Sequence, residues 1–376
     1  MEKLLAKRAR TSSSGIYLAW RSLIYKINMY DQTLLWQQPI EGLGPTICVE
    51  GDIVYAYSAQ VESFVYAFQS SSGVPLWTTV VAAYEVDNGI QLNELLALTV
   101  VEDTVYVLAR CGSIYALSAS TGEILSYCET EQVDEMNLGT LGLLIVDTIL
   151  YSAHFHILNA IDSKSSQVRW QTALPKGQNV LTLSMSGGRI YASADKDPEG
   201  SYIYAIAPEN GTWYWASPLL ADPIFVQPLY RGEYIFCTGA TTIYALAARD
   251  GHEIWEHHVG VTNYHPSCSE GEHLYICLRG SYQRAAESLC QEEEGTLLAL
   301  NFVDGALHWS RAIDFYPTMF HVKRGILYVR AENRGDLYAF DADNGASLWH
   351  VDPVINEASE NFMIKPGFGS ELIVIP

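Results

Sequence analysis

Apolar and polar residues alternate with a period of two along most of the chain, in short runs that break at turn residues. The run "VYAFQ", for example, stops at a serine and glycine turn and resumes as "PLW". No window keeps the apolar stripe with a 3.6-residue period that a helix would show. Tyrosine is abundant, with 24 residues, and aromatic side chains favour strands. The pattern predicts an all-β protein.

One phrase recurs eight times. It consists of a Tyr, a Gly seven positions later and a Trp four positions after that, as in "VYAFQSSSGVPLW" and "LYAFDADNGASLW". The copies end at residues 36, 77, 126, 170, 215, 255, 309 and 349. A spacing of this size is typical of propellers and of helical arrays, and the strand pattern excludes the arrays.

A second hairpin precedes the phrase, as in "LTLSMSGGRIYAS" and "PLYRGEYIFCTG". Each unit therefore supplies four antiparallel strands, named A to D in chain order. One such sheet cannot bury its apolar face alone, whereas neighbouring sheets bury it by stacking. We therefore predict an eight-bladed β-propeller of four-stranded antiparallel blades.

The Gly and the Trp of the phrase have separate structural roles. The Gly ends the turn between strands C and D, where a left-handed backbone is costly for a residue with a Cβ. The Trp begins strand D, where its ring packs on the neighbouring blade and its N–H needs a partner. The predicted docking residues are Trp36, Trp77, Trp170, Trp215, Trp255, Trp309 and Trp349. Some copies depart from the phrase: Ser126 replaces a Trp, Ser166 replaces a Gly, and Lys26 stands where other copies have Ala.

The two ends of the chain complete each other. The first unit offers "GIYLAW", "SLIYKINMY" and "LLWQQPI", whereas surplus apolar residues ending in "ELIVIP" follow the last unit. We expect the C-terminal strand to close the ring in the first blade and so remove an exposed edge. "ELIVIP" and "GIYLAW" both fit one strand position, and the sequence does not choose between them. Residues 1–14 are predicted to be a flexible basic and polar segment, and residues 15–376 a single propeller domain.

Charge limits the partners. The chain has 22 basic and 43 acidic residues, a net charge of -21, which repels phosphate backbones and anionic lipid surfaces. We expect no nucleic-acid partner and a monomer. The apolar stretch "NLGTLGLLIVDTILYSA" is interrupted by Asp147, so it predicts two strands and no membrane span.

Neither the N-terminus nor the cysteines carry a strong signal. "MEKLLAKRARTSSSG" lacks the apolar core of a secretory signal, so we expect a cytoplasmic location for the chain as written. A start further upstream would make a periplasmic or other extracytoplasmic location the expectation. The seven Cys include no adjacent pair and no C-x-x-C, which is neither a disulfide framework nor a zinc signature. His154 and His156 lack a third ligand, so no metal site is predicted.

The phrases resemble the pyrroloquinoline-quinone-type repeat, whose motif is roughly Tyr-Ala-Leu-Asp-x-x-Thr-Gly-x-x-x-Trp. "IYALSASTGEI" and "LYAFDADNGASLW" are the most similar, and the resemblance spans about residues 17–376. It implies an eight-bladed propeller with docked tryptophans. The family includes quinoprotein dehydrogenases, the assembly lipoprotein BamB and sensor or scaffold domains, so the resemblance implies no single activity.

The enzymes of that family make demands that this sequence does not visibly meet. Many carry adjacent cysteines near the quinone and an acidic set around calcium, and neither can be matched here residue by residue. No cofactor and no catalytic residue are predicted. The alternative is pyrroloquinoline quinone with calcium in a quinoprotein dehydrogenase-like enzyme.

The longest connections lie on one side of the predicted blades. "AAYEVDNGIQLNEL" joins strand D to the next strand A, and "GSYQRAAESLCQEEEG" joins strand B to strand C. Loops on a rigid scaffold often carry function, so we expect the face made by D-to-A and B-to-C connections to be the working surface. The residues predicted near the channel mouth on that face are Tyr84, Glu85, Asp87, Asn88, Asp222, Gln227, Tyr264, His265, Asp314, Tyr316 and Asn361.

The sequence leaves three functions open. The first is a non-enzymatic scaffold that binds a protein or a small molecule. The second is a quinone-dependent oxidoreductase, or a hydrolase of unspecified kind. The third is a sensor domain of a larger protein.

Overall fold

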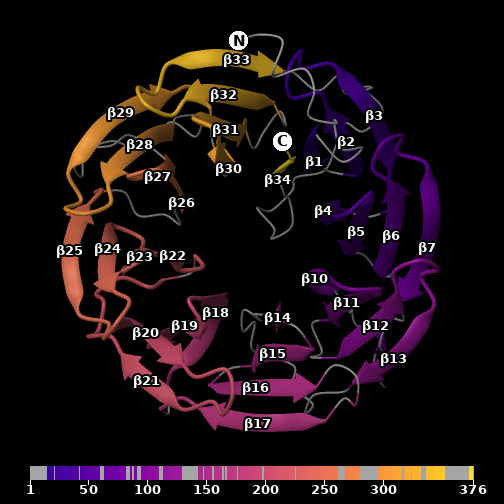
Figure 1. The fold of residues 1–376 in the computed structure, drawn as a ribbon, viewed down its shortest axis with the longest axis horizontal. Coiled ribbons are helices and arrows are strands. Elements are labelled where there is room, and N and C mark those ends of the chain that lie inside the picture. The colour runs from indigo at the N-terminus through magenta and orange to yellow at the C-terminus, as the bar shows by residue number, and fades with distance from the viewer. Residues whose placement is uncertain are drawn as a thin grey trace, which may run out of the picture. The chain divides into compact units, whose positions relative to one another are not determined.

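The computed structural model describes residues 15–20, 22–41, 43–59, 63–81, 85–86, 89–90, 95–109, 113–128, 143–146, 148–154, 156–162, 165, 167–175, 177–196, 199–224, 226–260, 267–279, 295–315, 317–331, 336–351 and 372–375. Within these residues the regular structure consists of eight four-stranded antiparallel sheets and one two-stranded hairpin. The prediction of an all-β, eight-bladed β-propeller is confirmed. Figure 1 shows the strands of each blade side by side.

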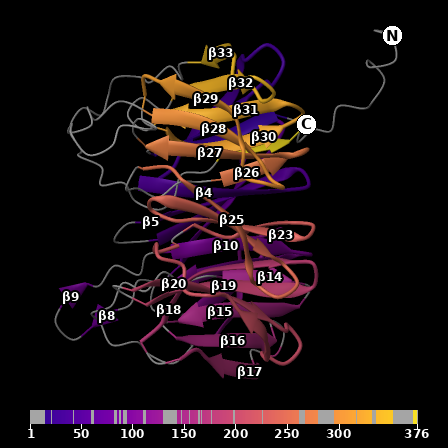
Figure 2. The same cartoon turned by 90° about the vertical axis from the view of Figure 1, so that its left-hand side faces the viewer.

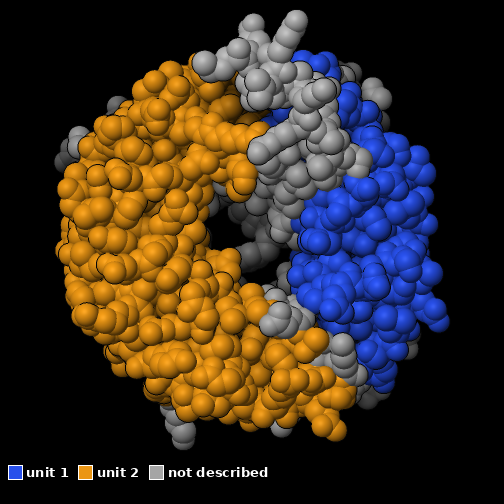
Figure 3. Space-filling view, in the orientation of Figure 1, with its two compact units in different colours: residues 1–132, 353–376 blue, residues 133–352 orange. Residues whose placement is uncertain are grey.

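The chain divides into two compact units, coloured separately in Figure 3. Unit 1 contains residues 1–132 and 353–376, and unit 2 contains residues 133–352. The predicted single domain over residues 15–376 stays a prediction, and the predicted flexible segment 1–14 lies outside the described residues.

Unit 1 contains three of the described blades. Blade 1 consists of β34 (Leu372–Ile375), β1 (Gly15–Trp20), β2 (Leu23–Ile27) and β3 (Leu34–Pro39). Blade 2 consists of β4 (Leu43–Glu50), β5 (Ile53–Ala59), β6 (Ser63–Gln69) and β7 (Pro75–Val81). Blade 3 consists of β10 (Leu95–Val101), β11 (Thr104–Ala109), β12 (Ile114–Ser118) and β13 (Ile124–Cys128). Between blades 2 and 3, β8 (Glu85–Val86) and β9 (Gly89–Ile90) form a hairpin that stands apart from the four-stranded blades in Figure 2.

Unit 2 contains the other five described blades. Blade 4 consists of β14 (Leu143–Val146), β15 (Ile149–His154), β16 (Ile157–Asp162) and β17 (Val168–Ala173). Blade 5 consists of β18 (Asn179–Ser186), β19 (Arg189–Lys196), β20 (Gly200–Ile206) and β21 (Trp213–Ala216). Blade 6 consists of β22 (Leu229–Arg231), β23 (Tyr234–Thr238), β24 (Thr242–Ala247) and β25 (Glu253–His258). Blade 7 consists of β26 (Ser267–Glu270), β27 (His273–Arg279), β28 (Gly295–Asn301) and β29 (Leu307–Ile313). Blade 8 consists of β30 (Pro317–Lys323), β31 (Ile326–Ala331), β32 (Leu337–Asp341) and β33 (Ser347–Val351).

The C-terminal strand completes blade 1, as predicted. β34 pairs antiparallel with β1, with Gly15 opposite Ile375 and Leu18 opposite Leu372. "GIYLAW" and "ELIVIP" therefore do not compete, because the first forms strand B and the second forms strand A. The pairing removes the edge that β1 would otherwise expose.

Register explains the Ala of the recurring phrase. In blade 2, Ala67 lies opposite Trp77 on the neighbouring strand, and Ala339 lies opposite Trp349 in blade 8 in the same way. A small side chain opposite an indole lets facing layers interdigitate at native packing density. Blade 1 is the exception, because Lys26 lies opposite Trp36.

The core lies between successive blades inside each unit. In unit 1, Tyr17 and Ile24 of blade 1 pack with Val54 and Phe68 of blade 2, all buried. The middle strands B and C of the blades thus bury both faces, as in β11 and β24, whose residues form nearly continuous buried apolar runs. Among the described residues there is no helix long and apolar enough to cross a membrane.

Candidate protein-binding face and blade docking sites

Connections from D to A and from B to C meet at the same edge of a blade. In blade 6 the Val259 N–H, just after strand D, donates to the carbonyl of Thr241 in the B-to-C connection at 2.8 Å. In blade 1 the Ile40 N–H donates to the Ser22 carbonyl at 2.9 Å in the same way. We call this edge the loop face; it is the face that the sequence predicts as the working surface.

The A-to-B and C-to-D turns meet at the opposite edge, which we call the turn face. The residue after strand C donates its N–H to a carbonyl of the A-to-B turn of its own blade. Ala119 bonds to Asp103 in blade 3 and Ala248 bonds to Glu233 in blade 6, both at 2.8 Å. These bonds fix the C-to-D turn, where the neighbouring blade docks.

Trp residues of strand D dock on the C-to-D turn of the next blade. The indole Nε1 donates to a main-chain carbonyl there over 2.8 to 3.2 Å. The pairs are Trp36 with Ser70, Trp77 with Ala119, Trp170 with Pro208, Trp215 with Ala248, Trp255 with Phe302 and Trp309 with Ala342. Trp349 lies 5.9 Å from the ring of Tyr328 in its own blade, measured between centroids. The donated bond satisfies the indole N–H. A buried N–H without an acceptor would destabilise the folded protein.

The Gly of the phrase makes room for the docked ring. Gly73 has a φ of 71°, and a Cβ built there would lie 2.7 Å from Cδ2 of Trp36. Any side chain would therefore meet both a strained backbone and the indole. The same φ range, 69° to 75°, recurs at the glycines in this turn: Gly73, Gly122, Gly211, Gly251, Gly305 and Gly345. The predicted left-handed conformation at these positions is confirmed.

A second side chain of strand D supports the docking. Two residues after the Trp, Thr79 donates its hydroxyl to the Gly122 carbonyl at 2.6 Å, and Thr172 donates to Gly211 at 2.7 Å. In blade 6 the same position is His257, whose Nδ1 lies 3.1 Å from the Gly305 carbonyl. Burial of this imidazole lowers its pKa, so the ring donates as a neutral group.

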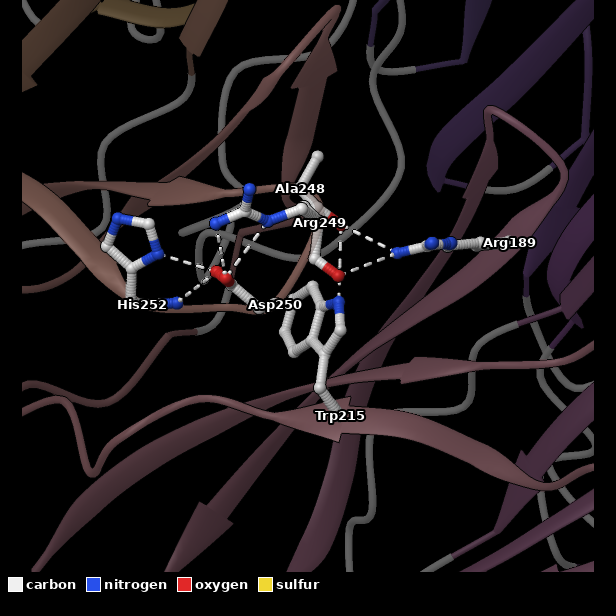
Figure 4. Close-up of polar contacts among 6 residues, drawn as sticks. All are labelled: Arg189, Trp215, Ala248, Arg249, Asp250 and His252. Atoms are coloured by element: carbon white, nitrogen blue, oxygen red, sulfur yellow. Dashed lines mark hydrogen bonds and ion pairs between the residues drawn. The ribbon is translucent and has the colours of Figure 1, made fainter.

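Blade 5 adds an arginine to its docking site on blade 6 (Figure 4). The Arg189 guanidinium donates to the Ala248 carbonyl at 2.8 Å, the carbonyl that Trp215 also binds, and lies 4.7 Å from the centroid of the Tyr214 ring. Next to them, the bonds from His252 and Arg249 lower the pKa of the Asp250 carboxyl to about 2. Figure 4 shows Asp250 directed toward those two side chains and away from Arg189. Asp250 therefore stabilises the C-to-D turn in which it lies and does not pair with Arg189.

Lys26 is a buried cation at the junction of blades 1 and 2. It is only 2% exposed, and its Nζ donates to the Ser70 carbonyl at 2.8 Å, the acceptor that Trp36 uses as well. The amine lies 5.0 Å from the centroid of the Tyr17 ring. Burial lowers the pKa of this amine to about 8, and the field of Asp52 opposes the shift. The charge is held by an acceptor and an aromatic face in place of water.

Two predicted site residues on the loop face have structural partners. The Asp222 side chain is buried and accepts bonds from the Thr241 N–H at 3.0 Å and from its hydroxyl. It thereby ties the D-to-A connection after blade 5 to the B-to-C connection of blade 6. The Gln227 amide donates to the Leu183 carbonyl at 2.6 Å. Both residues hold connections in place.

The structure describes only two of the other predicted site residues. Asp314 is exposed in the connection that follows β29. Glu85 begins β8, and only its main chain is described. The remaining predicted residues lie outside the described part of the chain: Tyr84, Asp87, Asn88, Tyr264, His265, Tyr316 and Asn361. Convergence of these side chains on a channel mouth stays a prediction.

The absence of a calcium and quinone site stays a prediction. Within the described residues, no three His, Cys, Asp or Glu side chains come close enough to hold a metal ion. Cys237 and Cys277 are buried in separate apolar clusters of blades 5 to 6 and 7 to 8, and burial raises the pKa of the Cys237 thiol. A buried thiol with a raised pKa is inert.

Sequence reasoning missed the polar residues that support the docking. Thr79 and Thr172 carry a readable signal, since both stand two positions after a Trp. Arg189 and Glu270 carry none. Glu270 accepts the main-chain N–H groups of Arg324 and Gly325 at 2.8 and 2.6 Å, a contact from blade 7 to the turn of blade 8. Such partners are set by blade packing, which a single strand does not reveal.

Comparison with known proteins adds the family. The model of a family described as "Outer membrane protein assembly factor BamB" matches residues 21–198, 199–312 and 284–363. The outer membrane protein assembly factor BamB of Yersinia pestis is 22% identical over 244 residues, which cover 62% of this chain. The chain spans 58% of that relative's length.

Solved structures show the same fold at low identity. The crystal structure of BamB from Moraxella catarrhalis matches with a TM-score of 0.66 and 16% identity, over 86% of this chain and 95% of that one. The quinohemoprotein alcohol dehydrogenase from Comamonas testosteroni matches with a TM-score of 0.60 and 14% identity, over 82% of this chain and 66% of that one. These likenesses establish the propeller fold, while the family model covers most of the sequence. The chain belongs to the family of the outer membrane protein assembly factor BamB.

Proposed function

We propose that this chain is a non-enzymatic propeller that binds another protein through its loop face. The matched relatives are named assembly factors for outer membrane proteins, and a protein of that kind acts on other proteins. From those names we carry over only the property of binding a protein partner.

The observation that carries the choice of face is the contact between Asp222 and Thr241. It joins a D-to-A connection to a B-to-C connection, so both kinds of connection contribute to one surface. The hairpin of β8 and β9 also belongs to a D-to-A connection, the one that follows blade 2. Variable loops held by rigid blades supply recognition without disturbing the core.

The turn face offers less room for a partner. Its turns are short, and their main-chain carbonyls already accept the docked indoles, as Ala119 and Ala342 do. A partner that displaced these bonds would loosen the junction between blades. The loop face carries no such constraint at the exposed Asp314.

The proposal is tested by shortening one loop on each face. In the first variant, residues 82–94 are replaced by a short glycine and serine linker. In the control, Glu50 and Asp52 on either side of Gly51 in the same blade are changed to Ser, so that the main-chain carbonyl of residue 52 still accepts the Ser70 N–H. Each chain is immobilised and its partners are identified by mass spectrometry against the unaltered chain. We expect the loop variant to lose a partner that the control retains. Retention of all partners by both variants removes this hairpin from the proposed contact.

We also propose that the chain acts without a bound quinone. Pyrroloquinoline quinone with calcium should then leave the melting temperature unchanged. A ligand present at 100 times its dissociation constant would stabilise the protein by about 2.7 kcal/mol, so a rise of several degrees would contradict this part of the proposal.

A further inference from the structure

Strand β13 exposes large apolar side chains along nearly its whole length. Ile124 is 41% exposed, Leu125 56% and Tyr127 61%. Ser126, which stands in the place of the docking Trp, is exposed as well. Where a docking Trp stands at this position, its side chain is buried or half-buried, as with the 7% exposed Trp36.

β13 is also an edge of its sheet. The strand order in blade 3 is β10-β11-β12-β13, so β12 pairs with only one side of β13. On the other side the alternate N–H and C=O groups of an edge strand are available to another extended chain. An extended segment is therefore the kind of occupant that satisfies both the main chain and the side chains of this strand.

Charge normally protects such edges, and β13 has none. Its sequence "ILSYC" contains no Asp, Glu, Lys, Arg or His. In unit 2, the corresponding edge strand β25 reads "EIWEHH", and β29 contains His308 and Arg311. Charged side chains on an edge prevent pairing with other chains. The edge strands β3, β7 and β21 are uncharged too, but each of them contains a Trp. β13 lacks both the charge and the Trp.

Acidic side chains lie where β13 begins. Glu123 precedes the strand, and Glu102 and Asp103 form the A-to-B turn of the same blade; all three are exposed. The Ala119 N–H bonds to the Asp103 carbonyl and so keeps this turn beside the C-to-D turn. A second copy of a chain with a net charge of -21 is repelled here, whereas a basic residue is attracted.

We propose that β13 binds an extended partner segment by antiparallel strand addition, and that this segment alternates apolar with small polar residues and ends in basic residues. Antiparallel pairing places the C-terminal end of the segment beside Ile124, next to the three acidic side chains. This surface is separate from the loop face of the proposed function, so the two proposals succeed or fail independently.

The probe is a short fluorescein-labelled peptide that alternates valine with threonine and ends in two lysines. Fluorescence anisotropy measures its binding to the full chain, and hydrogen exchange locates it. We expect saturable binding that weakens with added salt and protects the amides of residues 124–128. The double substitution Leu125→Lys and Tyr127→Lys should weaken binding about tenfold or more, because it places charge on the edge. Both side chains are exposed, so the variant should fold.

Two further variants separate the possible causes. The double substitution Ser310→Lys and Ala312→Lys puts the same charge on two exposed positions of edge strand β29 and should leave peptide binding unchanged. Glu123→Gln should reduce the salt dependence while the chain stays folded.

Three results would overturn the proposal. They are absence of saturable binding, equal weakening by the β13 and β29 variants, and exchange protection outside residues 124–128. Concentration-dependent association of the chain alone that the β13 substitutions abolish would show that a second copy occupies the edge, and this too would overturn it.

Discussion

The indole of Trp77 occupies the space that a side chain at position 122 would need. A Cβ built on Gly122 would lie 2.7 Å from Cδ2 of Trp77, and the residue has a φ of 73°. The Trp also donates to the carbonyl of Ala119 in the same turn. Ring, turn and missing side chain therefore form one docking unit, in which each part constrains the others.

Gly122→Ala should destabilise the protein by about 3 kcal/mol or more. The substitution forces an Ala into a left-handed backbone conformation, and its Cβ clashes with the indole of Trp77. The matched control is Gly51→Ala, because Gly51 has a φ of 56° but no atom within 4 Å of a built Cβ. The control should cost only the backbone strain, about 1 to 2 kcal/mol. Urea unfolding followed by tryptophan fluorescence measures both. Equal losses would mean that the ring does not fill this space in solution.

Thr79→Val should cost about 1 kcal/mol, because the Gly122 carbonyl loses its hydroxyl donor. Thr78→Val, at the neighbouring exposed position, should change the free energy of unfolding by less than about 0.5 kcal/mol. The comparison uses the same chemical change at adjacent positions of β7. A Thr78 effect as large as that of Thr79 would contradict the assigned bond.

His257 makes stability depend on pH. Burial lowers the pKa of His257 in the folded state, and the pKa values of His273 and His321 are lowered by burial too. The unfolded chain therefore binds more protons below the ordinary value of 6.5, so stability is lost as the pH falls through the folded-state pKa values. His257→Thr, which copies Thr79 and Thr172, should retain the bond to Gly305 and lose less stability between pH 7 and pH 5. An unchanged pH profile in this variant would exclude His257 as a contributor.

Lys26 makes the free energy of unfolding depend on pH in the alkaline range. Its folded-state pKa is lowered by burial from 10.5 to about 8, so the folded chain releases this proton before the unfolded chain does. Stability should rise as the pH increases from 8 to 10. The rise should vanish in Lys26→Met, which keeps a long apolar side chain beside Tyr17. Denaturant unfolding at a series of pH values tests this, and a rise that persists in the variant would contradict it.

The propeller fold could be predicted from the sequence because each repeat contains the residues of the docking unit. Tyr, Gly and Trp recur at fixed spacing, since the strand, the left-handed turn and the docked ring each require one residue type. The strand positions of the two chain ends were harder to predict. "GIYLAW" and "ELIVIP" belong to one blade, but a pairing between residues 15 and 375 has no local signal, so the sequence alone did not assign the two strands to positions B and A.

The candidate site was less predictable. Asp222 and Gln227 were expected at the channel mouth from their places in a loop, and the structure shows what each of them binds, Thr241 and Leu183. Such partners depend on how two connections approach in space. Arg189 follows a pair of glycines in the A-to-B turn of blade 5, and its carbonyl acceptor comes from the next blade. Composition does not encode a contact of this kind.

The central claim is that the loop face binds a protein, and photo-crosslinking by position tests it most directly. A photoreactive amino acid is placed at the exposed Asp314 or Leu219 on the loop face, and at Glu233 or Asn344 on the turn face, one position at a time. After irradiation in the native cells, adducts are resolved by mass and identified. Our account predicts a discrete protein adduct from the loop-face positions and none from the turn-face positions. The same adduct from the turn face, with none from the loop face, would contradict it.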